Sequence, residues 1–206
     1  MLNIPDEKTL VEQCRKQNSS AQKVLFDRYF DKMMTICLRY LKREDDALEA
    51  LNNAFLKVFD KISQYKSEGS LEAWIKRIVI NSSLDFVRSN KAYRDNFIHT
   101  DELHLYGESG EESISPDEWF NDALDFSKEE IFDLVAELPQ ASRIVLNLYV
   151  VDEFSHRQIS KQLKISEGTS RWHLSNARKI LKEKITQAVL IKNKKFNHGE
   201  ETERFR

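Results

Sequence analysis

The stretch from Ser155 to Leu181 constrains the fold of this chain more than any other part of the sequence. It predicts two short helices joined by a tight turn, the first running from about His156 to Leu163. The second begins after Ser166, a residue type that commonly caps helix N-termini. Apolar residues then recur at helical spacing along the second helix, at Leu174, Ala177 and Leu181. This pattern predicts a helix-turn-helix.

The second of these helices also carries a polar face. Its members are residues that can hydrogen-bond to bases or phosphates: Ser170, Arg171, His173, Ser175, Asn176 and Arg178. Arginine pairs bidentately with guanine and asparagine with adenine in a DNA major groove. A plain helical hairpin with a solvated polar face would show the same spacing, so the face alone leaves both interpretations open.

The composition favours an all-helical protein. The chain has 206 residues, of which only 5 are Gly and 3 are Pro, while 32% are charged. The two cysteines, Cys14 and Cys37, have neither metal-ligand nor disulfide-framework spacing, which fits a reducing compartment. We find no secretory signal and no apolar run long enough to span a membrane. The sequence therefore predicts a cytoplasmic protein without membrane insertion.

Charge is distributed unevenly along the chain. The net charge is +4 over residues 1–94, −13 over residues 95–138 and +8 over residues 139–198. Residues 95–127 contain no Lys or Arg, and their Asp, Glu, Gly and Pro content predicts a flexible acidic linker. Two basic modules flanking an acidic connector suit a polyanion that is bound at two places.

Four helices are predicted in the first module, at about 6–17, 19–41, 44–62 and 71–89. The third has an outer strip of Asp46, Glu49, Asn52 and Asn53, which either docks a protein or is merely solvated. On the fourth, a stripe at intervals of three and four residues could grip a phosphate backbone and an unstacked base: Arg77, Asn81, Asp85 and Arg88. A solvated amphipathic helix remains the alternative.

We therefore predict an all-α fold with two small helical domains joined by an acidic flexible linker, the second domain being a helix-turn-helix. The predicted limits are 1–94 for the first domain, 95–127 for the linker, 128–192 for the second domain and 193–206 for a tail.

Three segments, in this order, resemble bacterial sigma factors of the sigma-70 family, in the extracytoplasmic-function (ECF) group. DALEALNNAFLKVFDKI (46–62) resembles the helix that docks on RNA polymerase. SLEAWIKRIVINSSLDFVR (70–88) is similar to the helix that melts and reads the promoter −10 element. The segment from Leu138 to Leu181 resembles the domain that binds the −35 element.

The resemblance implies roles for particular residues. Those that would face core RNA polymerase are Asp46, Glu49, Asn52 and Phe55. Contacts to the unwound −10 strand would come from Arg77, Asn81 and Arg88, with Asn81 at an extruded base. Contacts to the −35 element would come from Ser166, Gly168, Thr169, Arg171, His173 and Arg178.

The sequence departs from the family pattern at a few of these positions. Asn52 and Asn53 replace the more usual Gln and acidic residue, and Lys164 stands in the helix-turn-helix turn where Gly is usual. Trp172, His173 and Asn176 replace the more usual Ser, Arg and Arg, which predicts an unusual −35 sequence.

The implied mechanism is binding rather than catalysis, with core RNA polymerase and promoter DNA as partners and no cofactor or metal. Family members are commonly held by an anti-sigma factor, but no feature of this sequence identifies one. Two alternatives remain: a stand-alone helix-turn-helix transcriptional regulator that binds duplex DNA, and a helical interaction protein with no nucleic-acid role.

Overall fold

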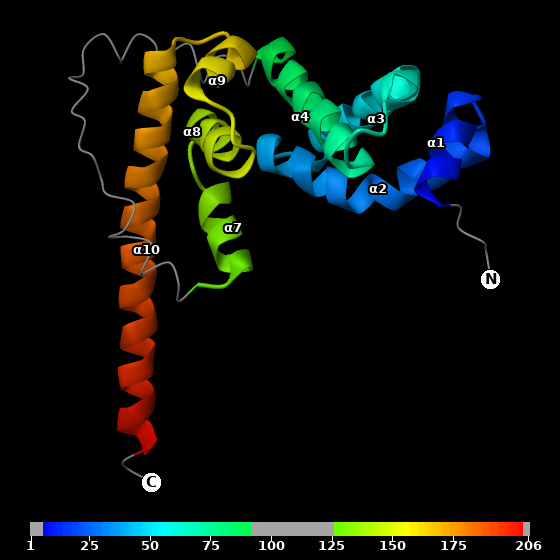
Figure 1. Cartoon of the computed structure of the whole chain (residues 1–206). Helices are drawn as coiled ribbons and strands as arrows, with labels where there is room; N and C mark the ends of the chain where they lie inside the picture. Colours follow the sequence, from blue (N-terminus) through cyan, green and yellow to red (C-terminus); the bar gives the residue numbers. More distant parts are fainter. Residues whose placement is uncertain (1–5, 92–125, 204–206) are drawn as a thin grey trace. The chain divides into compact units, whose positions relative to one another are not determined.

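The computed structural model describes residues 6–91 and 126–203, and for residues 128 and 193–203 the description is of the backbone. It divides the chain into two compact units, Met1–Arg94 and Asp95–Arg206. Within the described residues, all regular secondary structure is helical (Figure 1). The all-α prediction is therefore confirmed.

Over residues 6–91 the first unit consists of four α-helices and a short 3₁₀ turn: α1 (Glu7–Arg15), α2 (Ser19–Tyr40), α3 (Glu44–Lys61), η1 (Ile62–Gln64) and α4 (Leu71–Ser89). Three of the α-helices begin at a side-chain cap. Asp6 accepts a hydrogen bond from the Thr9 amide, Asn18 from the Ala21 amide and Ser70 from the Ala73 amide. Each cap satisfies one of the amides that a helix start leaves without an intrahelical partner.

The core of the first unit lies where α2, α3 and α4 pack on one another. It is filled by apolar side chains that recur at helical spacing, including Leu25, Met33, Leu51, Val58, Ile75 and Leu84. Phe55 of α3 is 2% exposed, and its ring lies 4.7 Å from that of Phe26 on α2 in an edge-on contact. Leu48 lies three residues before Leu51 in the apolar repeat of α3, but it is 40% exposed.

The second unit contains α7 (Lys128–Ala136), α8 (Gln140–Leu146), one turn of π-helix η2 (Asn147–Val151), α9 (His156–Leu163) and α10 (Glu167–Glu203). Both α8 and α9 pack on α10. The buried side chains that join them include Ile144, Val145, Leu148, Ile159, Leu174, Ala177 and Leu181. Reciprocal capping boxes start two of the helices, Ser127 with Glu130 on α7 and Ser155 with Gln158 on α9.

The predicted bounds of 71–89 and 156–163 coincide with α4 and α9. The tail expected at 193–206 is helical as far as Glu203, because α10 continues through a segment without proline. The predicted linker lies outside the described residues, apart from Phe126 and Ser127 at its end.

Candidate nucleic-acid interface

The turn between α9 and α10 has a left-handed residue. Lys164 has φ 57° and ψ 45°, and its amide donates to the carbonyl oxygen of Ser160. This is the usual way in which an α-helix ends, although glycine normally occupies the position. The αL residue lets the chain reverse direction within the few residues between Leu163 and Ser166, which produces the predicted helix-turn-helix.

The start of α10 is fixed by Ser166. Its hydroxyl oxygen accepts a hydrogen bond from the Thr169 amide at 2.9 Å and lies 2.7 Å from the Thr169 hydroxyl oxygen. Thr169 is 2% exposed, so its side chain serves this cap from the interior. Ser166 and Gly168 are exposed and lie at the surface of the turn.

The outer face of α10 presents basic and polar side chains. Arg171 is exposed and lies 3.2 Å from Glu167, one turn earlier on the helix. Ser175 is exposed, and Asn176 and Arg178 are half-buried. Because ion pairs of exposed side chains are weak, Glu167 leaves Arg171 able to exchange its partner for a phosphate or a base.

Our placement of His173 and Ser170 on that exposed face was wrong. His173 is 2% exposed and Ser170 is fully buried. The Nδ1 atom of His173 lies 3.2 Å from the Ser142 hydroxyl oxygen on α8. Because α10 is covered by α8 and by α9, its buried arc is wider than the apolar stripe alone indicates. In this conformation neither His173 nor Thr169 presents its side chain to a ligand at the surface.

A second polar contact joins α9 to α10. Nδ1 of His156 lies 2.9 Å from the Ser170 hydroxyl oxygen, and the imidazole stacks on Tyr149 at 4.6 Å between ring centroids. Burial, assisted by the nearby positive charge of Arg171, lowers the pKa of His156 below its ordinary value of 6.5. The imidazole is therefore neutral at neutral pH, and it acts as a hydrogen-bonding and packing group.

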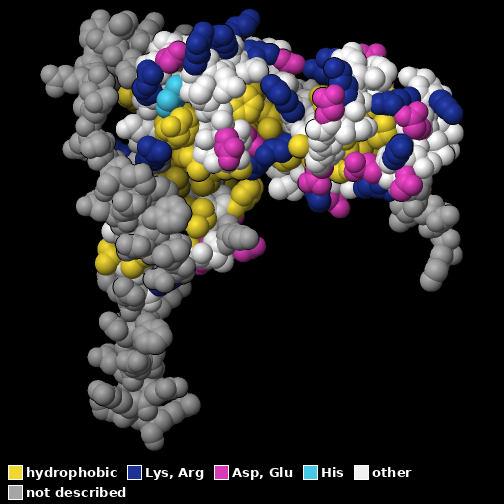
Figure 2. Space-filling view, viewed as in Figure 1, with side chains coloured by type: hydrophobic (Ala, Val, Ile, Leu, Met, Phe, Trp, Pro, Cys, Tyr) yellow, Lys and Arg dark blue, Asp and Glu magenta, His cyan; other side chains and the backbone are white. Residues whose placement is uncertain are grey.

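Basic side chains also gather on α9, next to α10. Arg157, Lys161 and Lys164 are exposed. Figure 2 shows dark blue Lys and Arg side chains over this part of the second unit. The first helix of a helix-turn-helix crosses the DNA backbone, so these cations lie where phosphates would pass. No sequence pattern singles these cations out, because they alternate with the apolar residues Ile159 and Leu163, which are the stronger signal along α9.

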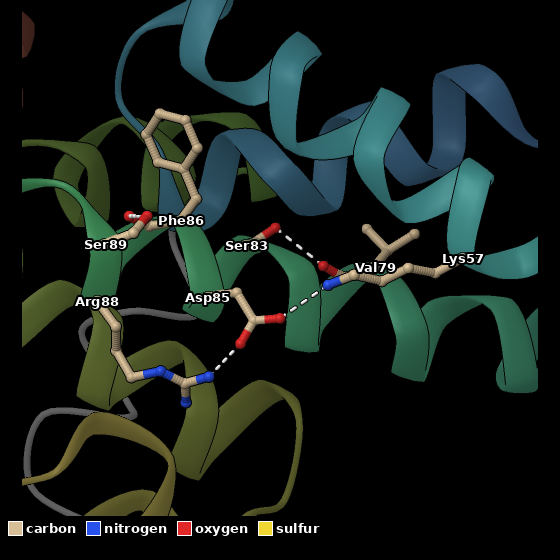
Figure 3. A network of polar contacts seen from close by, with 7 residues as sticks. All are labelled: Lys57, Val79, Ser83, Asp85, Phe86, Arg88 and Ser89. Carbon is tan, nitrogen blue, oxygen red and sulfur yellow. Dashed lines mark hydrogen bonds and ion pairs between the residues drawn. The ribbon is translucent and has the colours of Figure 1, made fainter.

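In the first unit, the predicted stripe on α4 contains an ion-pair network. Arg77 is exposed and Asn81 is half-buried. Further along, Asp85 binds Lys57 of α3 at 2.8 Å through one carboxylate oxygen and Arg88 through the other, as Figure 3 shows. The carboxylate thus ties α3 to α4 and partly neutralises the basic stripe.

The outer face of α3 differs from the prediction at one residue. Glu49 and Asn52 are exposed and Asp46 is half-buried, but Phe55 lies in the core. Its side chain cannot line a docking surface in this conformation. Leu56, which is 67% exposed, lies one turn after Asn52 and was missed. The signal was available, because Leu48, Asn52 and Leu56 recur at intervals of four residues on one side of the helix.

Residues 6–91 and 126–203 contain neither a metal-ligand cluster nor a membrane-spanning helix. His, Cys, Asp and Glu side chains there form no group of three or more that could hold a metal ion. Among these helices, none is both long and apolar enough to cross a membrane.

The fold and these surfaces define a helical protein with a helix-turn-helix in one unit and a polar, partly basic helix surface in the other. Comparison with known families adds the assignment. The sigma-70 region 2 model matches residues 25–93, and the sigma-70 region 4 model matches residues 128–181. The two models fall on separate units of the structure, in the family order.

Relatives align along nearly their whole length. The chain is 25% identical to the ECF RNA polymerase sigma factor SigW of Bacillus subtilis over 181 residues, covering 86% of this chain and 96% of the relative. It is 24% identical to the ECF RNA polymerase sigma-E factor of Haemophilus influenzae over 183 residues, covering 87% and 95%. For the sigma-E factor of Escherichia coli K12 the identity is 21% over 187 residues, covering 89% and 96%. The chain belongs to the sigma-70 family, and it is a sigma factor of the ECF group.

Proposed function

We propose that this chain docks on core RNA polymerase through α3 and reads promoters at two places, the −10 element through α4 and the −35 element through the start of α10. The observation that carries the proposal is the presence of region 2 and region 4 in one chain, each on its own helical unit. Bond formation belongs to the polymerase, so the chain acts by binding. Its place of action is the cytoplasm, where bacterial DNA and polymerase lie.

Docking is assigned to the exposed side of α3. The residues proposed to contact the polymerase are Asp46, Glu49, Asn52 and, in place of the buried Phe55, Leu56. An exposed leucine beside acidic and amide groups provides both an apolar anchor and hydrogen-bonding partners, as protein interfaces require.

Strand separation of the promoter DNA at the −10 element is assigned to α4. Arg77 would grip the phosphate backbone, and Asn81 would hydrogen-bond to a base that has left the stack, in the manner of single-strand binding surfaces. Arg88 contributes a further cation, held in place by Asp85. Capture of an unstacked base favours melted DNA without ATP.

Reading of the −35 element is assigned to Ser166, Gly168, Arg171 and Arg178, with Asn176 added. Thr169 and His173 would support the helix from within. Because the two units are connected, binding by one raises the effective concentration of the other, so each contact can be weak alone.

Run-off transcription tests this function. Purified core polymerase would be combined with the chain on a library of upstream regions from its own genome. We expect initiation at a discrete subset of promoters, and only when the chain is present. Asn81→Ala should reduce this initiation at least tenfold, whereas Ser89→Ala should leave it unchanged. Ser89 is an exposed residue near the end of the same helix.

A second arm of the experiment tests docking. Glu49→Lys, which reverses an exposed charge on α3, is expected to weaken binding to core polymerase, whereas Lys23→Glu on exposed α2 surface is not. If the chain does not bind core polymerase but shifts duplex DNA alone, the proposed docking through α3 is contradicted. Co-purification of a second protein that blocks docking would identify an anti-sigma factor.

A further inference from the structure

One buried hydroxyl group on α8 contacts two side chains of α10. Ser142 is 1% exposed. Its Oγ accepts a hydrogen bond from Asn176 Nδ2 at 3.1 Å and lies 3.2 Å from His173 Nδ1. His173 and Asn176 are three residues apart on α10, so they share one side of that helix.

The hydroxyl group can serve both partners at once. A serine oxygen carries one hydrogen and two lone pairs. The Asn176 amide uses one lone pair, and either the hydrogen or the second lone pair remains for His173 Nδ1. Two contacts from one fixed point to one side of α10 restrict the rotation of α10 about its axis relative to α8.

The contact also restricts the Asn176 amide group. A carboxamide has two N–H hydrogens and one carbonyl oxygen in a plane. Donation of one hydrogen to Ser142 sets the orientation of this plane and leaves the second hydrogen and Oδ1. These two are the groups with which asparagine binds adenine, donating to N7 and accepting from N6. Asn176 is half-buried, so part of its side chain reaches the surface of the helix-turn-helix.

We propose that Ser142 is a positioning residue that orients Asn176 to read an adenine within the −35 element. The inference rests on the proposed function of α10. It assigns a specificity role to a residue that cannot touch DNA, and it makes Asn176 a base-reading residue. Without the Ser142 contact, the amide could rotate and would accept several bases with similar affinity.

The test uses the full chain in complex with core polymerase and a promoter library randomised over the −35 element. Base preference at each position would be measured for the wild type, Ser142→Ala, Asn176→Ala and the double variant. Ser160→Ala is the matched control, because it removes a serine hydroxyl of the same unit that donates to a backbone carbonyl oxygen, that of Arg157.

We expect Asn176→Ala to reduce the preference for adenine at one position by about tenfold, the scale of one bidentate contact. Ser142→Ala should reduce the preference at the same position, and the double variant should behave like Asn176→Ala alone. Such non-additivity is the signature of coupled residues. Ser160→Ala should retain the wild-type preference.

The proposal is overturned if Ser142→Ala keeps the wild-type base preference while Asn176→Ala loses it, or if the two effects are additive. Should Ser142→Ala fail to fold, as judged by circular dichroism, Ser142→Cys takes its place, since a thiol of similar size accepts hydrogen bonds only weakly. If the wild-type chain itself shows no base preference over the −35 element, the proposed function of α10 is refuted instead.

Discussion

At the scale of single residues, Lys164 carries a conformational cost. A side chain in the left-handed region costs about 1–2 kcal/mol relative to glycine, and the flexibility of glycine in the unfolded chain offsets part of this. Lys164→Gly should therefore raise the free energy of unfolding by about 0.5–1 kcal/mol, measured by urea denaturation with circular dichroism. Lys161→Gly, an exposed site inside α9, should lower it by about 1 kcal/mol. A decrease in the free energy of unfolding for both variants would contradict a conformational cost at Lys164.

The cysteines give a second prediction at this scale. Burial raises the pKa of Cys37 from 9.0 to about 11, and burial also raises the pKa of Cys14. Because the thiolate is the reactive form, both should react slowly with a thiol reagent at pH 8 in the native chain and fully after unfolding. The folded state holds the Cys37 proton more tightly than the unfolded state, so stability should fall as pH rises from about 9 to 11. Rapid modification of the native chain at pH 8 would refute the buried placement.

At the scale of elements, the capping box at the start of α9 is expected to stabilise the helix-turn-helix. Ser155 accepts from the Gln158 amide, and Gln158 accepts from the Ser155 amide. Ser155→Ala should lower the free energy of unfolding by about 1 kcal/mol and weaken −35 binding through partial melting of α9. Ser155→Asp, which retains a capping oxygen, should keep the free energy of unfolding and the −35 binding close to the wild-type values.

The ion-pair network between α3 and α4 gives the next prediction. Asp85→Asn keeps the shape of the side chain but removes the negative charge between Lys57 and Arg88. We expect tighter binding of the holoenzyme to non-promoter DNA and a salt dependence that is steeper by about one unit of logarithmic slope. Titration with fluorescent DNA at several salt concentrations measures both. Asp60→Asn, an exposed carboxylate on α3, should have a smaller effect, and an equal effect would mean that net charge alone matters.

At the scale of the whole molecule, charge separation suggests a prediction for the segment between the two units. Residues 95–127 are acidic and contain no Lys or Arg, while the flanking segments are basic. Deletion of residues 97–115 should strengthen non-specific DNA binding by the free chain, because an acidic segment competes with phosphates for the basic surfaces. Replacement by a neutral Gly/Ser segment of equal length is the control for linker length. Unchanged non-specific DNA binding in both variants would count against competition between the acidic segment and DNA phosphates.

The sequence by itself determined the helical class, the placement of the helices and the helix-turn-helix. These depend on local chemistry: capping by Ser70, Ser155 and Ser166, apolar residues at helical spacing, and a scarcity of glycine and proline. Because each signal acts within a turn or two of helix, it can be read directly along the chain. The order of three segments then indicated the family, which the comparisons confirmed.

Only the tertiary structure decided which polar and aromatic residues are inside. Ser170 is fully buried, His173 faces Ser142, and Leu56 lies at the surface. A helix packed on two sides buries an arc that periodicity along one sequence does not define, because the width depends on neighbours distant in the chain. The contact between Ser142 and Asn176 joins residues 34 positions apart. No local pattern pairs them, and their hydrogen bond exists because α8 and α10 pack together.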